Sequence, residues 1–163
     1  MARATADRSA LLKVLRERYV SAGSERWNAA DFLYERGSVP SALLYAAIFL
    51  PQFVEVEGEV FFEELGVQPQ DGRAGLAELV RLRRRESAEA LKVFVDSCNW
   101  LEVPYLVGQD FGAEAEITVL AGLLVEAWDA RLRAQYPERR FRVRVLPQQE
   151  TGGAIGVGFE MEA

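Results

Sequence analysis

A run of glutamates in residues 55–64 is the first group of side chains in this sequence with the chemistry of a functional site. Glu55, Glu57, Glu59 and Glu63 alternate largely with hydrophobic residues. Closely spaced carboxylates can bind a hard cation or act together as general acid and base. The stretch lacks the spacing of a calcium-binding loop, and its period of two is typical of the solvent-facing side of a strand. We interpret the four glutamates as a solvated strand face and as the candidate surface for a protein partner.

Residue types that commonly carry out catalysis are scarce in this chain. Histidine is absent, which excludes His-based acid–base chemistry, Ser-His and Cys-His nucleophile pairs, and most zinc sites. The single cysteine, Cys98, falls on the hydrophobic stripe of a predicted helix, where cysteine usually behaves as a small buried hydrophobic residue. We therefore predict no catalytic residue, no metal and no cofactor.

Glycines gather near the C-terminal end, in residues 152–158. The stretch superficially resembles a phosphate-binding loop, but it lacks the Lys-Ser/Thr pair and no helix follows. Gly152 and Gly153 are expected in a turn. Gly156 and Gly158 fall on one side of an alternating strand and leave that side bare, which permits close approach of backbone, a ligand or a partner strand.

Arginine is concentrated in residues 81–85 and 131–144. Guanidinium groups are well suited to bidentate contacts with phosphate or carboxylate. One interpretation is an anion-binding surface, and the other is pairing with the surplus glutamates of the chain itself. We favour the second, because the net charge is −6 and acidic side chains are in excess.

Bulk composition limits the environment and the partners. Half of the 163 residues are hydrophobic, and no hydrophobic run approaches the length of a membrane span. The net charge of −6 argues against nonspecific binding to nucleic acid or to an anionic membrane. One cysteine excludes an internal disulfide, and the N-terminal stretch lacks the pattern of a signal peptide. We expect a cytoplasmic protein.

The elements that must position these groups follow from hydrophobic periodicity. Helical spacing is found in about five segments, at residues 7–20, 24–37, 38–50, 75–99 and 113–137. The pattern leaves open whether residues 75–99 form one helix or two. The third segment is hydrophobic all round, which predicts a buried helix.

A period of two indicates two hairpins, near residues 53–63 and 140–161, and Gly58 suits the tight turn of the first. Phe53 and Phe61 break the alternation, which predicts that one of them packs beneath a loop or marks a bulge. We predict a single α+β domain over residues 1–163, with one antiparallel sheet of about four strands covered on one face by about five helices. On the other face we expect the glutamates to pair with Arg140, Arg142 and Arg144.

Three functions are compatible with these observations. The first is a noncatalytic protein-interaction module, including an immunity-type protein that neutralises a basic toxin or enzyme by charge complementarity. The alternative is a carboxylate-dependent hydrolase or small-ligand-binding domain, which predicts an apolar pocket with convergent carboxylates and arginines. A third is a structural subunit, for which a large apolar surface patch would be the sign. The sequence specifies neither the identity of a partner nor the oligomeric state.

Overall fold

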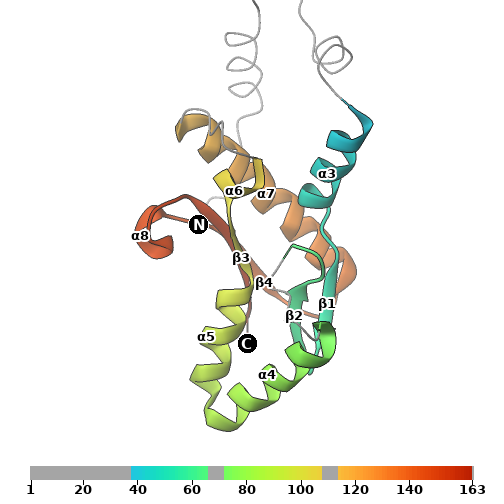
Figure 1. The fold of residues 1–163 in the computed structure, drawn as a ribbon, viewed down its shortest axis with the longest axis vertical. Helices are drawn as coiled ribbons and strands as arrows, with labels where there is room; N and C mark the ends of the chain where they lie inside the picture. The colour runs from blue at the N-terminus through green and yellow to red at the C-terminus, as the bar shows by residue number, and fades with distance from the viewer. Residues whose placement is uncertain (1–37, 66–71, 108–113, 163) are drawn as a thin grey trace, which may run out of the picture.

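The computed structural model describes residues 38–65, 72–107 and 114–162 (Figure 1). Helices and antiparallel strands are both present, which confirms the α+β class. The predicted helices at residues 7–20 and 24–37 lie outside the described residues. The described elements, in chain order, are α3 (Val39–Phe49), β1 (Phe53–Val56), β2 (Glu59–Phe62), α4 (Gly72–Glu86), α5 (Ala88–Cys98), β3 (Trp100–Glu102), α6 (Val103–Val107), α7 (Glu114–Gln135), β4 (Phe141–Leu146), α8 (Gln148–Thr151) and β5 (Gly156–Met161).

The strands form two sheets, so the prediction of one four-stranded sheet is wrong. β1 pairs only with β2, while the second sheet has the order β3-β5-β4 with antiparallel neighbours. Both predicted hairpins are present as paired strands, but they do not pair with each other. The short strand β3, which was not predicted, pairs with the edge of β5.

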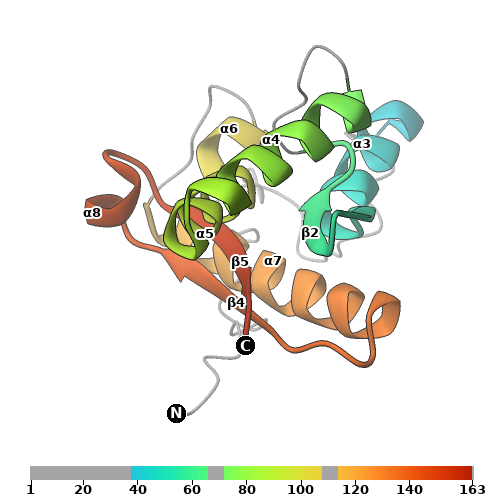
Figure 2. The same cartoon turned by 90° about the horizontal axis from the view of Figure 1, so that it is seen from below.

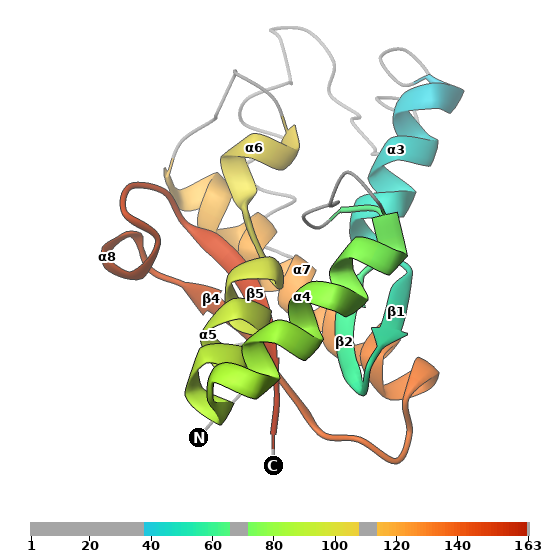
Figure 3. The ribbon, with the colours of Figure 1, turned by 60° about the horizontal axis from the view of Figure 1, so that its bottom comes forward.

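The first hairpin is buried on both faces, which explains its broken alternation. Phe53, Val60 and Phe62 belong to a core cluster with α7 and β5, whereas Val54 and Phe61 pack with α4 and α5. Figures 2 and 3 show the hairpin between α4 and α7. Phe53 and Phe61 are both core residues on opposite faces, and neither marks a bulge. A two-stranded hairpin alone is marginally stable, so its stability depends on these two layers.

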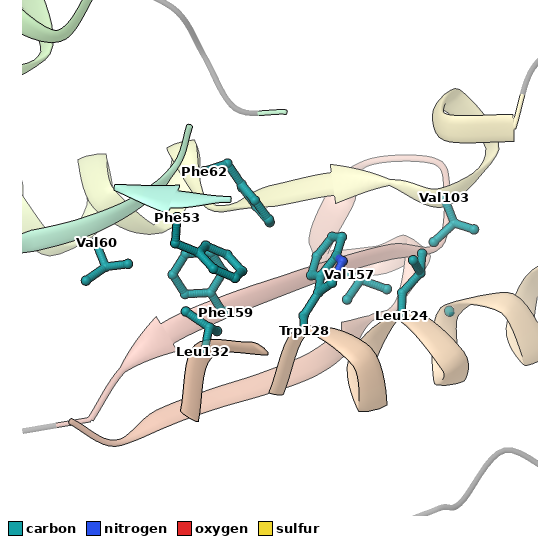
Figure 4. Packing of buried hydrophobic residues seen from close by; sticks show 10 residues of the cluster. Phe53, Val60, Phe62, Val103, Leu124, Trp128, Leu132, Val157 and Phe159 are labelled. Atoms are coloured by element: carbon teal, nitrogen blue, oxygen red, sulfur yellow. The ribbon is translucent and has the colours of Figure 1, made fainter. Parts of the chain in front are cut away.

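Helix α7 forms the base of the larger core. Ala121, Leu124, Trp128 and Leu132 are fully buried along one stripe, as the helical spacing predicts. The Trp128 ring meets Phe62 edge-on, with ring centroids 4.9 Å apart, and the aromatic cluster around it is seen in Figure 4. Such aromatic pairs each add roughly 0.5–1.5 kcal/mol beyond the hydrophobic area that they bury.

Residues 72–98 form two helices. α4 ends at Glu86, and the side chain of Ser87 caps α5 by accepting a hydrogen bond from the Ala90 N–H at 2.9 Å. An N-cap serine has extended backbone angles, which interrupt the helix at this residue. The two helices pack against each other on the outer side of the hairpin.

Helix α3 projects from the rest of the described structure (Figures 1 and 3). Only its last turn packs on the core, through Ile48 and Phe49, and the indole N–H of Trp128 donates to the Ile48 carbonyl at 2.8 Å. None of its residues is fully buried, so the prediction of a buried helix is wrong for the described residues. Across the described ranges, no helix combines the length and hydrophobicity needed to cross a membrane.

Candidate functional site

The tip of the first hairpin, residues 55–59, brings three of the four candidate glutamates together. Glu57 and Gly58 have φ angles of 53° and 86°, both in the left-handed region that a two-residue hairpin turn requires. This turn exposes Glu55 and Glu57, while Glu59 beside them is half-buried. Glu63 lies beyond the other end of β2, where its N–H donates to the Gln52 carbonyl at 2.9 Å, so it does not join them.

An arginine from the α7–β4 connection holds one side of the hairpin tip. Arg139 pairs with Glu55 at 2.7 Å and donates to the Gly58 carbonyl at 3.1 Å. Its guanidinium carbon also lies 5.7 Å from the centroid of the Tyr136 ring. The carboxylate of Glu55 and a turn carbonyl are therefore fixed by the same side chain.

Two arginines from α4 hold the other side of the hairpin tip. Arg81 pairs with Glu57 at 3.2 Å, while Arg84 pairs with Glu59 at 3.0 Å and donates to the Glu57 carbonyl at 2.6 Å. Together with Arg139 they form what we call the arginine clamp. The favoured interpretation, that arginines of residues 81–85 pair with the chain's own glutamates, is confirmed for Arg81, Arg83 and Arg84.

The predicted pairing of the hairpin glutamates with Arg140, Arg142 and Arg144 is wrong. Because the two hairpins lie in separate sheets, Arg142 and Arg144 face other carboxylates. Arg142 lies 3.5 Å from Glu160, and Arg144 lies 2.7 Å from Glu150. The sequence contained no signal for the partner choice, which depends on the packing of α4 against the hairpin.

Gly156 and Gly158 lie beside β3 in the second sheet, where they pair with Glu102 and Trp100. A Cβ on Gly158 would sit 2.9 Å from the Trp100 Cβ and 3.1 Å from the Asn99 carbonyl oxygen. At Gly156 it would sit 3.1 Å from the Trp100 ring and 3.2 Å from the Leu101 carbonyl oxygen. Real Cβ atoms almost never approach other atoms this closely, so the bare strand side admits the backbone and indole of the chain's own β3.

A groove of about 230 Å³ runs beside these glycines, between α5, α8 and the outer face of the second sheet. Basic and acidic side chains alternate along it in contact with one another. Lys92, at its edge, reaches Asp96 at 2.6 Å and Glu160 at 3.1 Å. Its lining includes the side chains of Ser97, Trp100, Arg142, Arg144, Glu150 and Glu160.

Two titratable side chains in or near the groove, Lys92 and Cys98, have pKa values raised above their ordinary values. Hydrogen bonds to Asp96 and then to Glu160 raise the pKa of Lys92 against the opposing effect of partial burial, which keeps it protonated. Burial raises the pKa of the Cys98 thiol, which makes it a poor nucleophile.

Asn99 is a polar residue that the sequence did not single out, and it links the two sheets. Its side-chain NH₂ group donates to the Val60 carbonyl of β2 at 2.7 Å. Its backbone carbonyl accepts from the Phe159 N–H of β5 at 3.0 Å. Asn99 is fully buried, and its Oδ1 atom has no hydrogen-bond partner in the structure. Its position just after α5 carries no recognisable motif.

Within the portions of the chain that the structure describes, no three His, Cys, Asp or Glu side chains are grouped so as to hold a metal ion. Comparison with protein-family models, with curated proteins and with solved structures found no match for this chain.

Proposed function

We propose that this chain is a noncatalytic protein-interaction module of the cytoplasm that binds a basic protein through the hairpin tip. The observation that carries the proposal is that Glu55 and Glu57 stay 43% and 36% exposed although each is ion-paired. Exposed ion pairs contribute only about 0–1 kcal/mol each, so a partner's arginine or lysine can replace the clamp arginines at little cost.

The charge of the whole chain supports a basic partner. A net charge of −6 attracts a basic protein over long range and repels nucleic acid and anionic membranes. Neutralisation of a basic toxin or enzyme by an immunity-type protein is the form of this function that the charge favours. Its affinity should fall with ionic strength, because the exposed carboxylates are screened by salt.

The hydrolase and ligand-binding alternative receives less support. The alternative predicts a pocket with convergent carboxylates and arginines. The groove does bring such side chains together, but Arg142 is paired with Glu160 and Arg144 with Glu150. Its volume of about 230 Å³ lies below the roughly 300–1,000 Å³ that is usual for small-molecule sites.

Affinity capture on the immobilised full chain, washed at low and at high salt, tests the proposal. We expect a basic protein to be retained at low salt and released at high salt. Once that protein is purified, the E55Q/E57Q double variant should bind it about tenfold more weakly. The matched control E89Q/E102Q makes the same change in net charge on exposed positions of α5 and β3, and it should change the affinity little. Equal affinities for the two double variants, or no retained basic protein, would refute the proposal.

A further inference from the structure

The outer surface of α3 exposes large hydrophobic side chains on every side of the helix. All residues from 38 to 46 are exposed, and Figure 3 shows this part of the helix standing clear of the other described elements. We call its large side chains, with that of the C-cap residue, the α3 surface. They are Val39, Leu43, Leu44, Tyr45 and Leu50, which are 74%, 66%, 68%, 49% and 59% exposed.

A hydrophobic surface of this kind is unusual on a folded chain. Soluble monomers rarely expose contiguous apolar patches, and a helix that is hydrophobic all round normally lies inside a packed structure. The core beneath α3 meets only the last turn, through Ile48 and Phe49. The first two turns therefore need an occupant that approaches from outside the described residues.

We propose that residues 7–34 of the same chain are this occupant and pack their hydrophobic stripes against the α3 surface. Their sequence has the required pattern, with Leu11, Leu12 and Leu15 in a first stripe and Trp27 and Leu33 in a second. Two amphipathic segments can cover a helix from two sides, which a helix hydrophobic all round requires. This inference is independent of the proposed function, because it involves a different surface and a different occupant.

Chain length and connection fit this arrangement. The exposed part of α3 spans nine residues, or about 14 Å, and a helical segment of 14 residues is about 21 Å long. Gly23 and Gly37 separate the segments from each other and from α3. Helices that follow one another through short connections usually pack side by side and antiparallel.

Charge also favours residues 7–34 over a second copy of the chain. Of the 19 basic and 25 acidic side chains, seven and five lie in residues 1–37, which leaves twelve and twenty in residues 38–163. The N-terminal part is therefore basic and the remainder acidic, whereas two whole chains of net charge −6 repel each other. A tethered segment is also present at an effective concentration on the order of millimolar.

Photo-crosslinking in the full chain tests the occupant directly. The photoreactive residue p-benzoylphenylalanine would replace Leu43, or Val93 as a control that is likewise exposed but lies on α5. Equal amounts of unlabelled and ¹⁵N-labelled chains would be mixed before irradiation, so that crosslinks within a chain differ in mass from crosslinks between chains. We expect crosslinks from position 43 to residues 7–34 of the same chain, and none to that segment from position 93. Crosslinks between two chains, crosslinks elsewhere, or none would overturn the inference.

A matched pair of variants provides a second readout in the full chain. Leu15→Gln removes a side chain from the first hydrophobic stripe, whereas Lys13→Gln alters the opposite side of the same segment. Amide hydrogen exchange in residues 42–46 should become about tenfold faster in L15Q than in K13Q, because loss of the cover exposes α3 to local opening. Identical exchange rates in the two variants would show that residues 7–34 do not cover α3.

Discussion

Replacing Gly158 with alanine tests the close approach of β3 to β5. The new methyl group would lie 2.9 Å from the Trp100 Cβ and 3.1 Å from the Asn99 carbonyl oxygen. The Trp100 Cβ atom is bonded to the backbone and the Asn99 oxygen is part of it, so neither atom can move without displacing the backbone of residues 99 and 100. The Leu146 Cδ1 atom, at 3.1 Å, is the only one of the three nearest neighbours at the end of a flexible side chain.

The expected cost follows from overpacking. Inserting a methyl group into a well-packed site destabilises a protein by about 1–3 kcal/mol. Replacing glycine also reduces the entropy of the unfolded chain, which offsets about 0.4–1 kcal/mol of that cost. We expect Gly158→Ala to lower the free energy of unfolding by about 1–2 kcal/mol, which for a chain of this size lowers Tm by roughly 2–8 °C.

Urea unfolding followed by tryptophan fluorescence would measure the change. Gly153→Ala is the matched control, because no atom lies within 4 Å of its Cβ position and its φ is not in the left-handed region. That control should be neutral or slightly stabilising. Gly156→Ala, with nearest contacts of 3.1–3.2 Å, should fall between the two. If Gly158→Ala is no less stable than Gly153→Ala, the close packing of β3 on β5 is wrong.

Three further predictions concern the arginine clamp and the core. Arg84→Gln removes a charged hydrogen bond to the Glu57 carbonyl and should lower the free energy of unfolding by about 1–2 kcal/mol in urea. Arg83→Gln, which breaks only an exposed pair with a glutamate one turn away, should change it by less than about 0.5 kcal/mol. Trp128→Phe leaves a helix-end carbonyl of α3 without its donor and should cost about 1–3 kcal/mol by the same measurement; an unchanged midpoint would contradict the indole hydrogen bond. Because burial raises the pKa of Cys98, its contribution to stability is complete below the unfolded-state pKa, near about 8.5, and is lost as pH rises through the folded-state value. The free energy of unfolding should therefore fall more steeply above that pH in the wild type than in Cys98→Ala, and equal slopes would contradict a buried thiol.

Local features were predicted well from the sequence because they depend on neighbouring residues. The stripe of α7 through Leu124 and Trp128, the turn at Gly58 and the strands of both hairpins follow directly from periodicity and turn chemistry. The exclusion of histidine chemistry needed composition alone. The serine cap that separates α4 from α5 was recognisable at Ser87, although the sequence did not show whether the helix bends or breaks there.

Long-range features were not predicted, because side-chain periodicity does not specify which elements meet. The three residues of β3 are too few to show a period, so the strand that occupies the edge of β5 was missed. The first hairpin was assigned one buried face because Glu55, Glu57 and Glu59 alternate, but α4 and α7 bury both faces behind the hairpin tip. For the same reason the glutamates were assigned the wrong arginines.

The most direct test of the central claim compares Arg81→Gln with Arg85→Gln in binding to a captured basic partner. Both variants remove one positive charge from α4, but only Arg81 is paired with Glu57, at 3.2 Å. If the hairpin tip binds the partner, freeing Glu57 should raise the affinity of R81Q above that of R85Q, by about threefold for an exposed pair. Equal affinities would mean that net charge alone governs binding, and a lower affinity for R81Q would contradict the proposed role of the hairpin glutamates.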